Sequence, residues 1–236
     1  MPSRARFLLV AVATVLASTV LTPSADAAAP TPRVGQCHRL TTTQISRRSD
    51  TGPAVRCRRG HTTQTVAVPS LPSLAGLTPA QLEALGERAC FPAVARALGR
   101  TSAKRSLSAY RFVFFFPTPA QVTAGAHWVR CDVVLRHGRS NARLVGRLPK
   151  PIVPRRLTDD VRLCMTRAGA FTACDRRHAF RSLRAVRVRG TAFPTGQGFS
   201  AASARCGRRA DVFTTPTASE WSAGDHTIVC FTRTRA

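Results

Sequence analysis

The chain has 236 residues, of which 36 are Lys or Arg and 11 are Asp or Glu, so its formal net charge at pH 7 is +25. Such a charge favours polyanionic partners, among them anionic wall polymers, anionic lipids, nucleic acid or an acidic protein, without selecting one of them. Only 6% of the residues are aromatic, which gives little support for a surface that stacks single-stranded bases, so nucleic acid is not supported beyond charge. The length allows one large domain or two small ones.

Residues 1–27 have the order of a secretory signal peptide. Arg4 and Arg6 precede an apolar run over Phe7–Leu21, and Ala25-Asp26-Ala27 supplies the small residues of a cleavage site. The run is shorter than the ~20 apolar residues that span a bilayer, which disfavours an uncleaved membrane anchor. We therefore predict cleavage near Ala27 and a secreted mature chain without a transmembrane span.

Eight cysteines follow the leader, and in an exported protein an even number indicates a disulfide framework. They form two sets of four with one pattern: Cys, then Cys-x3-His, then Cys, then His-x3-Cys. The end of the first set, Pro117–Cys131, matches Pro216–Cys230 at a constant offset without a gap. The sequence therefore predicts a duplicated module, with the two tandem copies at residues 28–137 and 157–236.

The first module contains one clear helix start and two apolar strands. Thr78–Gln81 supplies an N-cap threonine, a first-turn proline and a capping-box glutamine, and Pro92 is expected to end or kink the helix near Cys90. Arg111–Phe116 is apolar on both faces, which predicts a buried central strand. Val129–Leu135 alternates apolar and polar residues, as a strand with one face on the core does. We predict an α+β fold in which each module is a short antiparallel sheet with one helix.

Between the modules, Gly138–Arg156 contains three prolines, six basic residues and no acid. That composition predicts a stiff, exposed, basic linker over residues 138–156. At the start of the second module, Asp159-Asp160 in the sequence Thr158-Asp159-Asp160 could be a carboxylate pair for acid–base chemistry. We expect instead an N-cap followed by an acidic first helical turn, which is the commoner use of this pattern.

Four cysteines in each module allow three pairings. We expect the first two cysteines of each module to pair with each other, and likewise the last two. The second bridge of each module would then join the helix to the last strand. The predicted disulfides are Cys37–Cys57, Cys90–Cys131, Cys164–Cys174 and Cys206–Cys230.

A zinc site is the competing interpretation of the same cysteines, because each half combines two cysteines with two histidines: His61 and His127, or His178 and His226. If His127 and Cys131 lie on one strand, however, they are ~13 Å apart and cannot share an ion. A zinc site would also leave half of the cysteines unexplained. We therefore expect no metal and no other cofactor. We expect these four histidines to be structural side chains, with a binding contact as the alternative, and we expect His61 and His178 to bond a loop carbonyl through a ring nitrogen.

No G-x-S-x-G elbow, P-loop or H-E-x-x-H motif occurs, and oxidised cysteines leave no thiol nucleophile. The chain is therefore predicted not to be an enzyme, and a secreted enzyme with an active site assembled from distant residues is the alternative. Exposed arginines are the better candidate for function, although a merely solvated face would show the same pattern. The arginines predicted to contact anions are Arg58, Arg59, Arg155, Arg156, Arg187 and Arg189.

Two blocks resemble the septum formation-related domain family. Gly35-Gln36-Cys37 with Val55–His61 is similar to the family's opening G-D-C … V-x-C-x-x-P-H, and Pro216–Cys230 is similar to its ending P … W-x-x-G … C. Gln36 replaces the acid of that opening, and Gly60 replaces its proline. The resemblance implies an exported actinobacterial cell-envelope protein without a defined reaction. We expect it to bind anionic wall or membrane polymers, or an envelope protein.

Overall fold

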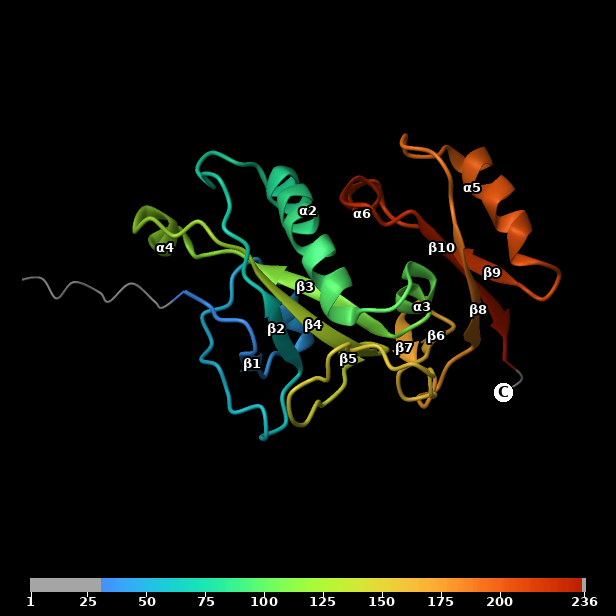
Figure 1. Cartoon of the computed structure of the whole chain (residues 1–236), viewed down its shortest axis with the longest axis horizontal. Helices are drawn as coiled ribbons and strands as arrows, with labels where there is room; N and C mark the ends of the chain where they lie inside the picture. The colour runs from blue at the N-terminus through green and yellow to red at the C-terminus, as the bar shows by residue number, and fades with distance from the viewer. Residues whose placement is uncertain (1–30, 235–236) are drawn as a thin grey trace, which may run out of the picture.

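The computed structural model describes residues 31–234, in which ten strands form one antiparallel sheet (Figure 1). Its main path runs β1-β2-β4-β7-β6-β8-β10-β9, and β3 and β5 each pair with β4. The strands are β1 Cys37–His38, β2 Thr63–Ala67, β3 Tyr110–Phe115, β4 Arg130–His137, β5 Ser140–Asn141, β6 Leu163–Met165, β7 Phe171–Ala173, β8 Phe180–Arg187, β9 Val212–Thr214 and β10 Thr227–Arg233. The helices are α1 Thr42–Ile45, α2 Pro79–Leu98, α3 Ser102–Ser106, α4 Pro119–Thr123, α5 Gly196–Ser203, the 3-10 turn η1 Ala204–Cys206 and α6 Ala218–Ala223.

The predicted signal peptide, residues 1–27, lies outside the described residues. Within residues 31–234, no helix has both the length and the apolar character needed to cross a membrane. The mixture of helices with an antiparallel sheet and four disulfides confirms the α+β prediction.

Helix α2 starts at the predicted residue and ends later than predicted. The Thr78 hydroxyl accepts a hydrogen bond from the Gln81 backbone N–H, and the Gln81 side chain accepts one from the Thr78 N–H, which completes the capping box. Of the two outcomes expected at Pro92, an end or a kink, an end near Cys90 is wrong, because the helix continues through Pro92 to Leu98. Burial of Val94 and Leu98 after the proline offsets the hydrogen bond that proline cannot donate.

The prediction that Arg111–Phe116 forms a central strand is also wrong. Within residues 31–234, β3 pairs with β4 alone. Its two apolar faces have separate coverings: Phe114 lies against α2, where a Cβ at Gly86 would come within 2.4 Å of the Phe114 ring. On the opposite face, Phe115 is fully buried beneath the Arg130 guanidinium, which lies 4.4 Å from the ring centroid. The apolar residues of β3 are thus covered by α2 on one face and by the Arg130 side chain on the other, and not by a second neighbouring strand.

The two halves share the order strand, helix, strand, helix, strand. In the first half the order is β2, α2, β3, α4 and β4, with the short α3 between α2 and β3, and β4 lies between β2 and β3 in the sheet. In the second half the order is β8, α5, β9, α6 and β10, with the turn η1 between α5 and β9, and β10 lies between β8 and β9. In both halves, a short strand carrying the first cysteine extends the sheet, β1 beside β2 and β6 beside β8.

Residues 138–156 are not an exposed linker. Ala142, Leu144, Ile152 and Val153 are buried in the main hydrophobic core, which also contains residues of both halves. The N–H of Ile152 donates to the Ala97 carbonyl, and the N–H of Val153 donates to the Leu98 carbonyl. The apolar residues scattered between the charges therefore fix this segment to the end of α2. The two predicted domains share one sheet and the main core, and the second half has a further core cluster around Val186, Phe199 and Trp221.

Candidate functional site

All eight cysteines form disulfides, in the four pairs expected from their order. Cys37–Cys57 and Cys164–Cys174 join the start of each half, Cys90–Cys131 joins α2 to β4, and Cys206–Cys230 joins η1 to β10. The zinc interpretation is therefore wrong, because its four cysteine ligands are oxidised and a zinc site needs thiolates. Those cysteines are Cys57, Cys131, Cys174 and Cys230.

The four predicted histidines lie at separate places, and three of them bond a nearby carbonyl. His127 Nδ1 is 2.9 Å from the Gly125 oxygen, and His178 Nδ1 is 2.6 Å from the Arg176 oxygen. His226 Nε2 is 3.1 Å from the Trp221 oxygen, and its ring stacks on the indole with centroids 3.9 Å apart. These contacts agree with the prediction that His127, His178 and His226 are structural side chains.

His61 departs from that reading. The residue is fully buried, and within residues 31–234 neither ring nitrogen has a hydrogen-bond partner. Its backbone instead forms a two-way bridge with Leu144, in which each N–H donates to the other residue's carbonyl. Burial lowers the pKa of the His61 ring below its ordinary value, because the charged form would lose its hydration.

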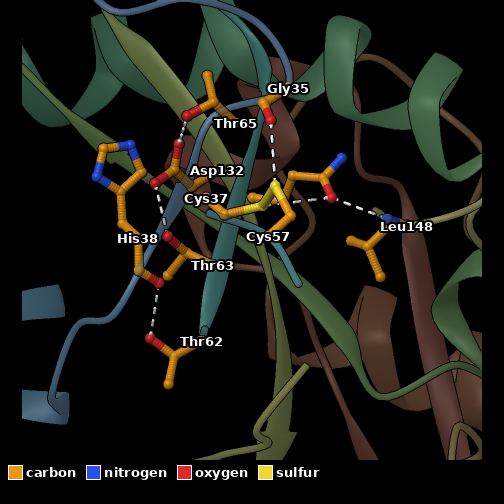
Figure 2. Close-up of a disulfide and its surroundings, with 10 residues drawn as sticks. Gly35, Cys37, His38, Cys57, Thr62, Thr63, Thr65, Asp132 and Leu148 are labelled. Atoms are coloured by element: carbon orange, nitrogen blue, oxygen red, sulfur yellow. Dashed lines mark hydrogen bonds between the residues drawn. A yellow bond between two sulfur atoms is a disulfide. The ribbon is translucent and has the colours of Figure 1, made fainter. Parts of the chain in front are cut away.

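A buried ionic network lies on the face of β2 and β4 that is turned away from α2. The Asp132 carboxylate accepts hydrogen bonds from the hydroxyls of Thr63, at 2.9 Å, and Thr65, at 2.8 Å. Arg130 donates from Nε to Asp132 Oδ1 at 3.1 Å and from Nη2 to Asp50 Oδ2 at 2.8 Å. These five side chains form what we call the Asp132 network. Figure 2 shows Asp132 between the two threonines, beside the Cys37–Cys57 disulfide.

His38 closes the network on the side of the N-terminal loop. Its Nδ1 lies 3.6 Å from Asp50 Oδ2, which is beyond hydrogen-bond distance, and neither ring nitrogen has a hydrogen-bond partner in the part of the chain that the structure describes. Burial, followed by the nearby Arg130 charge, lowers the pKa of His38 below its ordinary value. The neutral ring is therefore the form that fits this site.

The Asp132 network holds β2, β4 and the loop around Asp50 together. Thr63, Thr65 and Asp132 are fully buried, so a substrate has no approach to the carboxylate. In chemical terms the arrangement neutralises a buried guanidinium and fixes the register of two strands. It resembles an acid–base constellation in composition only, because catalysis requires contact with the reacting atoms.

The sequence prediction missed most of this network. Asp132 was placed on the polar face of its strand, which was correct, but nothing indicated that this face is also buried. Two signals were available: the threonines at 63 and 65 share one face of a strand, and Asp50 and Asp132 are two of only 11 acidic residues. Neither signal shows by itself that a loop far along the chain covers the sheet.

The expected helix start at Thr158 does not form. Residues 158–161 make a turn in which the N–H groups of Val161 and Arg162 donate to the Thr158 carbonyl. The exposed Asp159 carboxylate pairs with the Arg181 guanidinium, and this hydrogen bond is the first cause of its lowered pKa. Asp159 is therefore engaged in a surface ion pair, and Asp160 beside it is exposed.

All six arginines predicted to contact anions are exposed: Arg58, Arg59, Arg155, Arg156, Arg187 and Arg189. Val186 and Val188 are buried at 3% and 6% exposure, so Arg187 and Arg189 point outward as the alternation indicated. No side chain of the six forms a hydrogen bond or an ion pair with another residue in the described part of the chain. We call these six residues the exposed arginine set.

Comparison with protein families decides the wider relationship. The model of the family described as Septum formation matches residues 34–214. The chain belongs to the septum formation family. Residues 34–214 contain both cysteines of the first N-terminal bridge and the whole Asp132 network, whereas Pro216–Cys230 follows the matched range. The match to the septum formation family therefore covers strands β1–β9 of the sheet. No curated protein and no solved structure matches the chain.

Proposed function

We propose that this septum formation family protein is an exported, non-catalytic component of the cell envelope that binds anionic polymers through its exposed arginine set. The observation that carries the proposal is the exposure of six arginines without a protein partner on a chain of charge +25. Four disulfides support an oxidising compartment, as does the leader pattern of residues 1–27. The proposed polymers are anionic wall polymers or the anionic surface of the membrane, with an acidic envelope protein as the alternative partner.

The physical basis is charge attraction that salt can screen. An arginine beside an anionic lipid surface contributes about 1 kcal/mol, and the attraction falls off within a Debye length. That length shrinks from about 10 Å at 0.1 M salt to about 3 Å at 1 M. Retention on purified wall material or anionic vesicles should therefore be strong at low salt and lost at high salt.

The test is a pull-down with the oxidised chain from residue 28 onward, which contains every described residue. One variant replaces the exposed arginine set with Gln. The matched control replaces six other exposed arginines whose side chains form no hydrogen bond or ion pair in the described part of the chain: Arg47, Arg139, Arg167, Arg177, Arg208 and Arg209. We expect the first variant to lose retention at lower salt than the control. Retention that survives high salt, no retention at all, or equal loss in both variants would contradict the proposal.

We also propose that the two halves are copies of one module. The shared order of strands, helices and disulfides supports this, together with the ungapped match between Pro117–Cys131 and Pro216–Cys230. The main difference lies in the bridge that opens each half, which spans 20 residues in the first and 10 in the second. An experimental structure in which the strands of the halves pair in different orders would contradict the duplication.

A further inference from the structure

A groove of about 670 Å³ opens between α2 and the segment from Arg147 to Ile152. Its floor is the end of β2, at Val66 and Ala67, and Val34 stands at its mouth. This volume lies within the range of pockets that hold small organic ligands. The groove is separate from the exposed arginine set, none of which lines it.

Most residues that line the groove are apolar, which suits a chain of methylene groups. Ala93 and Ala97 lie one helical turn apart on α2, and their small side chains line one wall. The facing wall contains Leu148, Pro149 and Pro151, none of which carries a polar side chain. Val34, with 60% of its surface exposed, adds an uncovered apolar side chain at the rim.

Hydrogen bonds fix the facing wall in place. Leu148 donates its N–H to Gln64 Oε1 at 2.8 Å, a bond drawn beside the Cys37–Cys57 disulfide in Figure 2. At the other end, the N–H of Ile152 donates to the Ala97 carbonyl at 3.1 Å. The groove is therefore preformed, so a ligand does not have to order this segment when it binds.

The charge around the groove is of one sign. Arg96, Arg147 and Lys150 line it and are exposed, and no acidic residue lines it. Within residues 31–234, the side chains of these three cations form no hydrogen bond or ion pair with another residue. Arg96 lies in the last turn of α2, where a cation is also favourable toward the helix dipole, but that role does not involve Arg147 or Lys150.

We propose that this groove binds a single anionic lipid-like molecule, with its phosphate headgroup held by Arg96, Arg147 and Lys150 and its apolar chain lying along Ala93 and Ala97. Charge complementarity selects an anionic head, and the apolar walls select a tail over a free ion. The site is independent of polymer binding by the exposed arginine set. Inorganic phosphate shares the head chemistry and serves as the comparison ligand.

The test measures calorimetric binding of hexyl, octyl and dodecyl phosphate, each below its micelle concentration, to the oxidised chain from residue 28 onward. Affinity should rise with chain length, by up to about fourfold per methylene group until the groove is full. Inorganic phosphate should bind at least about tenfold more weakly than octyl phosphate. No binding, or equal affinity for octyl phosphate and inorganic phosphate, would overturn the proposal.

Two variants locate the ligand within the groove. Replacing Arg96, Arg147 and Lys150 with Gln should weaken octyl phosphate binding at least about tenfold, whereas the matched control R139Q/R167Q/R177Q should not. Ala97→Leu fills one wall and keeps the cations, so it should weaken octyl phosphate but leave inorganic phosphate unchanged. If either groove variant keeps its thermal midpoint and binds octyl phosphate as tightly as the control R139Q/R167Q/R177Q does, the placement of the ligand in this groove is overturned. Retention on wall material should be the same for the variant without Arg96, Arg147 and Lys150 and for its matched control. A loss of octyl phosphate binding is therefore distinguishable from a loss of polymer binding.

Discussion

Replacing Asp132 with Asn should destabilise the protein strongly, because the Asp132 network depends on that charge. The carboxylate is fully buried and accepts bonds from Thr63, Thr65 and Arg130. An Asn side chain keeps one acceptor oxygen and presents an NH₂ group to donors, and it leaves Arg130 with only Asp50 as a counter-charge. Breaking a buried ion pair by removing one partner costs about 3–5 kcal/mol.

The measurement is urea unfolding at neutral pH under oxidising conditions, with thermal unfolding as a second readout. For a chain of this size, 3–5 kcal/mol corresponds to a loss of about 6–20 °C in the midpoint. The matched control is Asp160→Asn, which makes the same chemical change at an exposed carboxylate and should shift stability by less than about 0.5 kcal/mol. A double-mutant cycle with Arg130→Met should show coupling of at least about 1 kcal/mol.

Two results would refute this reasoning. If Asp132→Asn costs no more than Asp160→Asn, the carboxylate does not stabilise the buried guanidinium. If the effects of Asp132→Asn and Arg130→Met are additive, the two side chains act separately despite their 3.1 Å contact.

Three further predictions concern pH and the disulfides. Burial lowers the pKa of His38, so the unfolded chain takes up a proton at a higher pH than the folded chain, and the free energy of unfolding should fall as pH drops below about 6.5. In urea unfolding, His38→Gln should reduce the slope of this free energy against pH. An unchanged slope would contradict the assignment. Burial raises the pKa of Glu87, so the folded state keeps the proton of this carboxyl up to a higher pH than the unfolded state does. Glu87→Gln should therefore raise the free energy of unfolding at pH 7, and the gain should vanish toward pH 4. A gain that persists at pH 4 would contradict this prediction. Replacing Cys206 and Cys230 with Ser opens a loop of 24 residues and should cost about 3.5 kcal/mol on the chain-entropy account, measured by urea unfolding, whereas a cost near zero would contradict it.

Local signals in the sequence predicted the features that depend on neighbouring residues. The Thr78 capping box fixed the start of α2 because both of its hydrogen bonds join residues three apart. The disulfide pairing followed from cysteine order because each bridge joins cysteines that are adjacent in the chain order. Val186 and Val188 placed Arg187 and Arg189 outward because strand alternation is a local rule.

Features that depend on contacts between distant segments were predicted wrongly or missed. The composition of residues 138–156 indicated a linker, yet Leu144 and Val153 are buried, and their backbone groups bond to His61, just before β2, and to Leu98 at the end of α2. Likewise, the polar face of β4 is buried because the loop around Asp50 lies over it. Both contacts join segments that are far apart in the chain. The sequence of the covered segment alone therefore does not predict them.

Several of the few acidic residues pair with groups of the protein itself, at the surface as well as in the interior. Asp132 and Asp50 neutralise Arg130 in the core, and Asp159 pairs with Arg181. The Asp211 carboxylate accepts hydrogen bonds from β10 at Thr232 and Arg233, so its charge is also bound to the fold. In the described part of the chain, the side chains of the exposed arginine set and of the groove cations form no such pairs. Surface cations without an internal partner are the pattern expected if the counter-charge comes from an external anion.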